Sequence, residues 1–176
     1  TNSYVSASNI KYNKNKTTFN IIKNEKNLGK VHMNVPGKHN VTNALASVVL
    51  GLELEIPFST ISNGIKSYMG VKRRFEIKKT HNDIIIIDDY AHHPTEIYAT
   101  LKAAKDGWGR RIIAVFQPHL YTRTRDFYKE FANSFLLSDI LIVTDIFGAR
   151  ENPIKGISGR IISNCASEKK HPNSLF

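Results

Sequence analysis

The stretch that decides the fold is Ile84-Ile85-Ile86-Ile87-Asp88-Asp89-Tyr90-Ala91-His92-His93-Pro94. Its opening apolar run is typical of a strand buried on both faces, as in a parallel sheet covered by helices. Pro94 suits the first position of a following helix, and Glu96 falls in that helix's first turn. The stretch therefore predicts a buried strand, a polar loop and a helix.

The same arrangement recurs towards the carboxyl terminus. Apolar runs at residues 112–116 and 140–143 predict two more buried parallel strands, with helical patterns between the runs. On one of those helices, phenylalanines recur every four residues, which is typical of a core stripe: Phe127, Phe131 and Phe135. Alternating strands and helices predict an α/β fold with right-handed connections and a mostly parallel sheet.

The first part of the chain has a different pattern. Residues 1–35 alternate apolar and polar side chains, as short strands do, with a hairpin turn at residues 24–27. Two helical patterns follow the Pro36-Gly37 turn: Leu45, Val48, Val49 and Leu52, then residues 59–68. Met69-Gly70-Val71 reads as a hinge, so we expect one domain at residues 1–70 and a second at residues 71–176.

Composition limits the classes of function. Hydrophobic residues make up 41% and charged residues 23% of the chain, as in ordinary globular proteins. No apolar run approaches the ~20 residues of a membrane-spanning helix, and residues 1–8 do not resemble a secretory signal. The single cysteine, Cys165, cannot form an internal disulfide, so we expect a cytoplasmic protein without membrane insertion. Since the first residue is not Met, we interpret the chain as a fragment or a processed chain.

The net charge of +10 leaves a basic nucleic-acid-binding module as an alternative function. The lysines are scattered among asparagines rather than interleaved with aromatic residues, so we expect a solvated surface and no nucleic-acid partner. His92 and His93 are adjacent, and adjacent side chains diverge, so we expect no metal site at this pair.

Polar residues follow each predicted strand, where ligands bind in open α/β sheets. Asp88 and Asp89 follow the first run, His119 follows the second and is followed by further polar residues, and Thr144-Asp145 follows the third. A second interpretation is that Asp89 only ends the strand and caps the next helix. Arg123 and Arg125 are either surface charges or anion ligands, and their closeness to His119 favours anion binding.

Together these motifs resemble the Mur ligases of peptidoglycan synthesis. The order and the spacing of the motifs match over about residues 34–163. The motifs that carry the resemblance are Pro36-Gly37-Lys38-His39-Asn40-Val41-Thr42-Asn43-Ala44, Gly70-Val71-Lys72-Arg73-Arg74-Phe75-Glu76, Asp88 to Glu96, Phe116-Gln117-Pro118-His119, Tyr121 to Asp126, Thr144-Asp145-Ile146, Pro153-Ile154 and Gly156-Ile157-Ser158-Gly159. The resemblance implies the end of a central ATP-binding domain followed by a Rossmann-like carboxyl-terminal ligase domain that is truncated here.

Within this family the chain most resembles the branch that joins L-alanine to UDP-N-acetylmuramate with ATP, through an acyl phosphate. A related branch that attaches murein tripeptide remains an alternative, although Phe116-Gln117-Pro118-His119 and Tyr121-Thr122-Arg123-Thr124-Arg125 favour alanine. The sequence contains no phosphate loop of the form G-x-x-x-x-G-K-[ST], so we expect no activity from this chain alone. Magnesium is expected, with ligands mainly outside this chain and none assigned here.

The resemblance also implies roles for individual residues. At the nucleotide, the resemblance implies that His39, Asn40 and Asn43 lie near the base and that Arg74 binds the phosphates. It implies that Asp89 lies near the ribose, with His92 and His93 beside Asp89. Those implied at the alanine substrate are His119, Arg123 and Arg125, and those implied in catalysis are Arg74, Asp89 and His119. Helix capping by Asn40 is a competing interpretation. Leu120 departs from the family, where many relatives have arginine, which puts a side-chain role at that position in doubt.

Overall fold

The computed structural model describes residues 4–176, so residues 1–3 of the expected first domain lie outside the described residues. The chain divides into two compact units. The first unit runs to Tyr90 and takes in Asp106–Trp108, and the second comprises Ala91–Lys105 and Gly109–Phe176.

The first unit contains an antiparallel sheet of three strands, β1 (Val5–Asn13), β2 (Lys16–Lys23) and β3 (Lys26–Met33), in that order. Along β2 the alternate residues Thr17, Phe19 and Ile21 are buried, as expected for a strand with one face on a core. Asn24 and Glu25, with φ of 46° and 65°, form the two-residue turn between β2 and β3. This confirms the predicted strands and hairpin turn.

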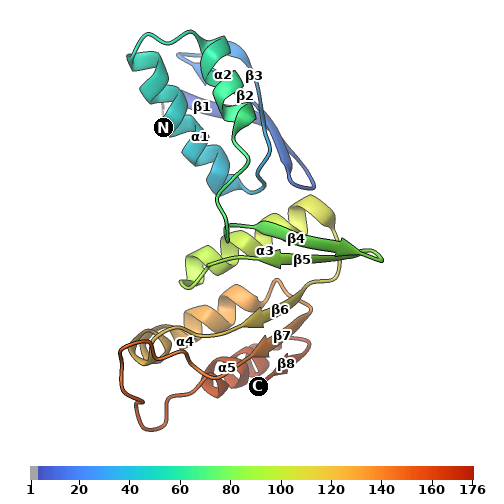
Figure 1. Ribbon diagram of the computed structural model, residues 1–176, viewed down its shortest axis with the longest axis vertical. Helices are drawn as coiled ribbons and strands as arrows, with labels where there is room; N and C mark the ends of the chain where they lie inside the picture. The colour runs from blue at the N-terminus through green and yellow to red at the C-terminus, as the bar shows by residue number, and fades with distance from the viewer. Residues whose placement is uncertain (1–3) are drawn as a thin grey trace. The chain divides into compact units, whose positions relative to one another are not determined.

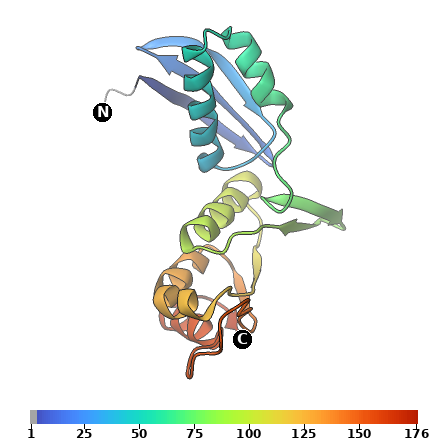
Figure 2. The ribbon, with the colours of Figure 1, turned by 60° about the vertical axis from the view of Figure 1, so that its left-hand side comes forward.

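Two helices pack side by side against this sheet, α1 (Lys38–Glu53) and α2 (Phe58–Ser67) (Figures 1 and 2). Their buried side chains include Val48 and Ile61, which join the core formed by β2 and β3. Gly51 is required where the helices meet, because a Cβ there would lie 2.7 Å from Ile61 Cδ1. Both predicted helices are confirmed, and the glycine inside the first pattern is explained by this close approach.

The run of four isoleucines at residues 84–87 forms a strand, but the strand is not of the expected parallel, buried type. Strand β5 (Ile84–Asp88) pairs antiparallel with β4 (Glu76–His81) in a two-stranded sheet. Ile84 is 64% exposed and Ile86 is 52% exposed. The prediction of a parallel strand buried on both faces is therefore wrong here. A short apolar run does not reveal its partner, and the turn at Asn82-Asp83 closes a hairpin that residues 76–81 complete.

In the second unit the strands are parallel, as predicted. Strands β6 (Ile113–Phe116), β7 (Ile140–Val143) and β8 (Ser174–Leu175) lie in that order and are joined through α4 (Tyr121–Phe135) and α5 (Arg160–Glu168). Helix α3 (Pro94–Trp108) precedes β6 (Figure 1). Ile113 and Val115 on β6 are 56% and 69% exposed, so the expected burial of both faces is wrong for this strand.

The core of the second unit is built from α3, α4, α5 and the strands β6 and β7. It includes Phe116, Phe131, Phe135, Leu141 and Ile162. Phe127, the first member of the predicted stripe, is instead 37% exposed. Among residues 4–176, every helix is too short or too polar to cross a bilayer.

Helix α3 begins with a capping box. His93 Nδ1 accepts a hydrogen bond from the Thr95 amide at 3.4 Å, and Glu96 Oε2 accepts one from the His93 amide at 3.2 Å. Pro94 occupies the first helical position, where its missing N–H costs nothing. Two otherwise unpaired amides at the helix end are thereby satisfied.

We predict that His93→Ala lowers the free energy of unfolding by about 1 kcal/mol, because it removes the side chain that caps α3. His93→Asn keeps a capping acceptor and should recover part of that loss, although it also loses the ring contact with Phe127. Urea titrations of the two variants and the parent chain measure this. Equal stability of His93→Ala and the parent would contradict the capping role.

Candidate active site at the ends of β6 and β7

The loops that follow β6 and β7 stay hydrogen-bonded to each other beyond the strands. The Thr144 amide donates to Phe116 O at 2.9 Å, the Phe147 amide to Pro118 O at 2.8 Å and the Leu120 amide to Phe147 O at 3.0 Å. His119 and Phe147 form an isolated parallel bridge, and their rings lie 5.6 Å apart. This pairing holds the backbone of His119 in place immediately before α4.

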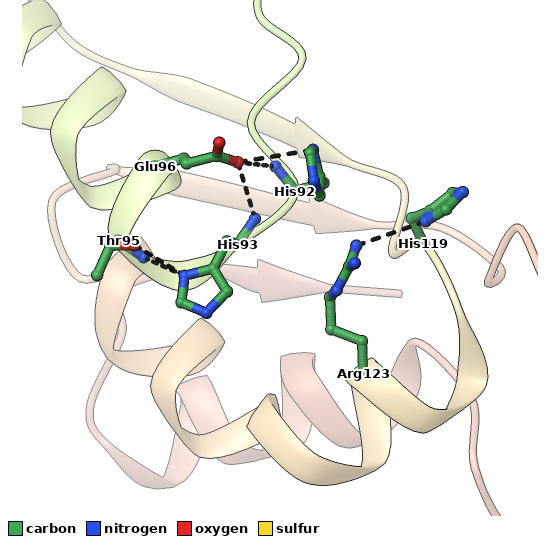
Figure 3. Close-up of polar contacts among 6 residues, drawn as sticks. All are labelled: His92, His93, Thr95, Glu96, His119 and Arg123. Carbon is green, nitrogen blue, oxygen red and sulfur yellow. Dashed lines mark hydrogen bonds and ion pairs between the residues drawn. The ribbon is translucent and has the colours of Figure 1, made fainter.

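His119 and Arg123 form the centre of the candidate site (Figure 3). Arg123 Nη1 lies 3.5 Å from His119 Nδ1, at the upper limit of a hydrogen bond. Since a guanidinium only donates, Nδ1 is the acceptor in this contact and Nε2 carries the proton of the neutral ring. Partial burial, with the charge of Arg123 and then His92, lowers the pKa of His119 below its ordinary value. The ring is therefore neutral at pH 7.

The structure separates the two adjacent histidines (Figure 3). His92 faces His119, with ring centroids 6.3 Å apart, and its Nδ1 lies 3.5 Å from Glu96 Oε2. His93 points the other way, onto Thr95 and the ring of Phe127. His92 is thus the member of the pair that joins His119 and Arg123.

The two predicted arginines of α4 also have different partners. Arg125 holds neighbouring Asp126 with two nitrogens, Nε at 2.7 Å and Nη2 at 3.2 Å. Arg123 lies two residues earlier, so the helical turn points the two side chains in opposite directions. The interpretation of Arg125 as a substrate ligand stays a prediction.

A second group of predicted residues lies in the first unit. The pKa of His39 is lowered because nearby protein atoms displace water from part of the ring, although the residue as a whole is exposed. The charge of Asp89 opposes this shift and the charge of Arg74 adds to it, so His39 interacts electrostatically with both residues. Asp89 Oδ2 also accepts a hydrogen bond from the Phe75 amide at 2.8 Å, which ties the end of β5 to the segment before β4.

Asn40 and Asn43 lie on the first turns of α1. Both line a mainly apolar groove of about 610 Å³ between α1, α2 and β3. Asn40 Nδ2 donates to Pro36 O at 2.7 Å, so one of its donors stabilises the turn before the helix. The helix N-cap itself is Gly37, without a side-chain cap, so Asn40 is not the N-cap.

The donor set does not fit a magnesium site. Within residues 4–176, no group of three or more His, Cys, Asp or Glu side chains is placed to hold a metal ion. Arg73 Nε lies 3.5 Å from Asp88 Oδ2, and Asp89 is bound to a backbone amide. These carboxylates are therefore engaged by protein donors.

Two carboxylates at the site were not assigned to it from sequence. Glu96 lies three residues after the N-cap His93, and this capping-box spacing is a recognisable signal. Glu151 accepts hydrogen bonds from Thr122 across 29 positions of sequence. No local pattern links residues so far apart, so only the tertiary structure reveals this contact.

Known protein families match both parts of the chain. The glutamate ligase domain of the Mur ligases matches residues 73–174, more than half of the chain, and the Mur ligase middle domain matches residues 1–51. The UDP-N-acetylmuramate–L-alanine ligase of Salinibacter ruber is 49% identical over 156 residues, which cover 88% of this chain and 33% of the relative. The chain therefore spans about a third of that relative's length.

Solved structures show the same relationship. The UDP-N-acetylmuramate–alanine ligase of Thermotoga maritima has a TM-score of 0.81 and 27% identity, with 98% of this chain and 37% of that chain covered. A murein peptide ligase of Psychrobacter arcticus has a TM-score of 0.59 and 24% identity, over 99% and 36% of the two chains, which shows a shared fold alone. On the domain match, the sequence identity and this shared architecture, the chain belongs to the Mur ligase family.

Proposed function

We propose that this chain is the carboxyl-terminal part of a cytoplasmic enzyme that joins L-alanine to the carboxylate of UDP-N-acetylmuramate at the expense of ATP. The relative from Salinibacter ruber carries that activity in its name. The single observation that carries the proposal is the His119–Arg123 pair at the exit of β6. We also propose that the domain boundary lies near residue 70.

The pair suits the carboxylate of a small amino acid. Arg123 uses one nitrogen towards His119 and is half-buried, and a guanidinium binds a carboxylate through two parallel hydrogen bonds. Neutral His119 offers its Nε2 proton as a further donor. The guanidinium of Arg123 therefore supplies the positive charge, and the uncharged imidazole of His119 supplies an additional hydrogen-bond donor.

The group in the first unit suits a nucleotide. Arg74 is exposed and permanently charged, which fits the oxygens of a transferring phosphoryl group. Asp89 is proposed near the ribose. Asn40 and Asn43, with His39 beside them, offer amide donors and acceptors for a base edge. The roles of His92 and His93 at the nucleotide, which the family resemblance implies, stay predictions.

The proposed reaction has two steps. A carboxylate oxygen of the muramate attacks the γ-phosphorus of ATP, so that an acyl phosphate forms and ADP leaves. The uncharged alanine amine then attacks the acyl carbon, inorganic phosphate leaves with the bonding electrons, and the nitrogen releases one proton to solvent as the amide forms. Arg74 stabilises negative charge in the first step, and Arg123 and His119 orient the amine in the second. Magnesium ligands are proposed in the part of the enzyme that this chain does not cover.

The first test is the activity itself. The 176-residue chain alone should release no phosphate from ATP in the presence of alanine and UDP-N-acetylmuramate, because its sequence contains no phosphate loop. A complete ligase that contains this chain should do so with alanine and not with murein tripeptide. Turnover with tripeptide alone would assign the chain to the other branch, and salt-sensitive nucleic-acid binding without turnover would favour the basic module.

We predict that Arg74→Ala in the complete ligase lowers kcat about a hundredfold, because one positioned charge at a transferring phosphoryl group is removed. Arg73→Ala is the matched control, since Arg73 pairs with Asp88. Steady-state rates at varied ATP measure both variants. If the two substitutions have equal effects, Arg74 has no special place at the phosphates.

We predict that Arg123→Lys raises the KM for alanine about tenfold to a hundredfold and leaves the KM for ATP unchanged, because lysine keeps the charge but loses the two-pronged geometry. Arg160→Lys on α5 is the control for general loss of a guanidinium. An unchanged KM for alanine together with lower thermal stability would mean that Arg123 only braces α4.

A further inference from the structure

The start of α4 lacks a cap of its own. Its N-cap residue is Leu120, which offers no side-chain acceptor and has a φ of 74°, a strained value for a branched side chain. The first amides of a helix need acceptors, and a helix end without them is costly. Arg123 lies in the first turn of α4, so the position of the helix start determines where the Arg123 guanidinium lies.

The missing acceptor comes from the loop after β7. One carboxylate oxygen of Glu151 accepts from the Thr122 amide at 3.0 Å, and the other accepts from the Thr122 hydroxyl. The loop packs tightly here, because a Cβ on Gly148 would lie 2.7 Å from the ring of Tyr121 and 3.0 Å from Glu151 O. Glu151 thus caps α4 from outside the helix.

The charge of Glu151 also reaches the candidate site. Hydrogen bonds from Thr122 are the main cause that lowers the pKa of Glu151, and the charge of Arg123 lowers it further, so the residue is an anion at neutral pH. Among the described residues, the charges of Arg123 and His92 lower the pKa of His119, and the charge of Glu151 raises it. Glu151 is therefore coupled to both members of the alanine-binding pair.

We propose that Glu151 is a positioning residue for alanine: it holds the uncapped start of α4 against the loop after β7 and so fixes Arg123 beside His119. This inference rests on the proposed role of Arg123 in binding alanine. Glu151 itself touches Thr122 rather than the substrate, so its effect on the reaction passes through the first turn of α4. Its negative charge also attracts the positive charge of Arg123.

Kinetics of the complete ligase test the inference. Glu151→Ala should raise the KM for alanine about tenfold and change the KM for ATP less than twofold, because one charge-assisted cap is lost next to Arg123. Glu151→Gln keeps an acceptor oxygen for Thr122 and should show a smaller increase. Glu130→Ala removes an exposed carboxylate from the same helix and is the matched control.

A second readout does not depend on activity. In NMR titrations of the 176-residue chain, Glu151→Gln should lower the pKa of His119 further, because the carboxylate that favours the protonated ring is gone. The Thr122 amide should also exchange faster with solvent in Glu151→Ala. Unchanged His119 titration and unchanged Thr122 exchange would overturn the inference whatever the kinetics show.

The two proposals fail in different ways. If Arg123→Lys raises the KM for alanine and Glu151→Ala does not, Glu151 is not a positioning residue and the proposed function stands. If Arg123→Lys leaves that KM unchanged, the alanine site is wrong, and the inference built on it is overturned with it. If Glu151→Ala changes the KM for alanine and the KM for ATP equally, Glu151 only stabilises the fold and the inference is overturned.

Discussion

Backbone pairing that continues past the ends of β6 and β7 is the constraint on which the candidate site depends. Parallel strands end at the same edge of a sheet, and here their exit loops remain joined through Phe116–Thr144, Pro118–Phe147 and Leu120–Phe147 hydrogen bonds. A loop with its own backbone hydrogen bonds has few alternative conformations. His119 therefore starts from a rigid support, although it lies outside regular secondary structure.

Neighbouring residues of the same type contact different partners in this protein. His92 faces His119 while His93 caps α3, and Arg123 lies at His119 while Arg125 holds Asp126. The cause is geometric, because neighbouring side chains leave a strand, loop or helix in different directions. A motif with two histidines or two arginines thus places its two like side chains on different partners.

The interpretation of the sequence succeeded where a signal was local. Pro94 and Glu96 mark the start of α3, the Pro36-Gly37 turn precedes α1, and residues 24–27 form the hairpin turn. It failed where the answer lay in a distant partner. The isoleucine run of β5 pairs antiparallel with β4, and Ile113 and Val115 stay exposed on β6. An apolar run indicates that a strand tends to be buried, but it does not indicate which other element packs against each face of the strand.

Periodicity, turn residues and motif spacing are properties of the chain alone, so they were enough to predict the alternation of strands and helices, the family resemblance and the polar residues at the strand exits. Which of those residues meet became known from the packing of the elements. It placed His92 opposite His119, turned His93 onto Phe127 and brought Glu151 to Thr122 across 29 positions. Such contacts depend on how separate elements pack, and their geometry is set by the whole fold rather than by any local pattern.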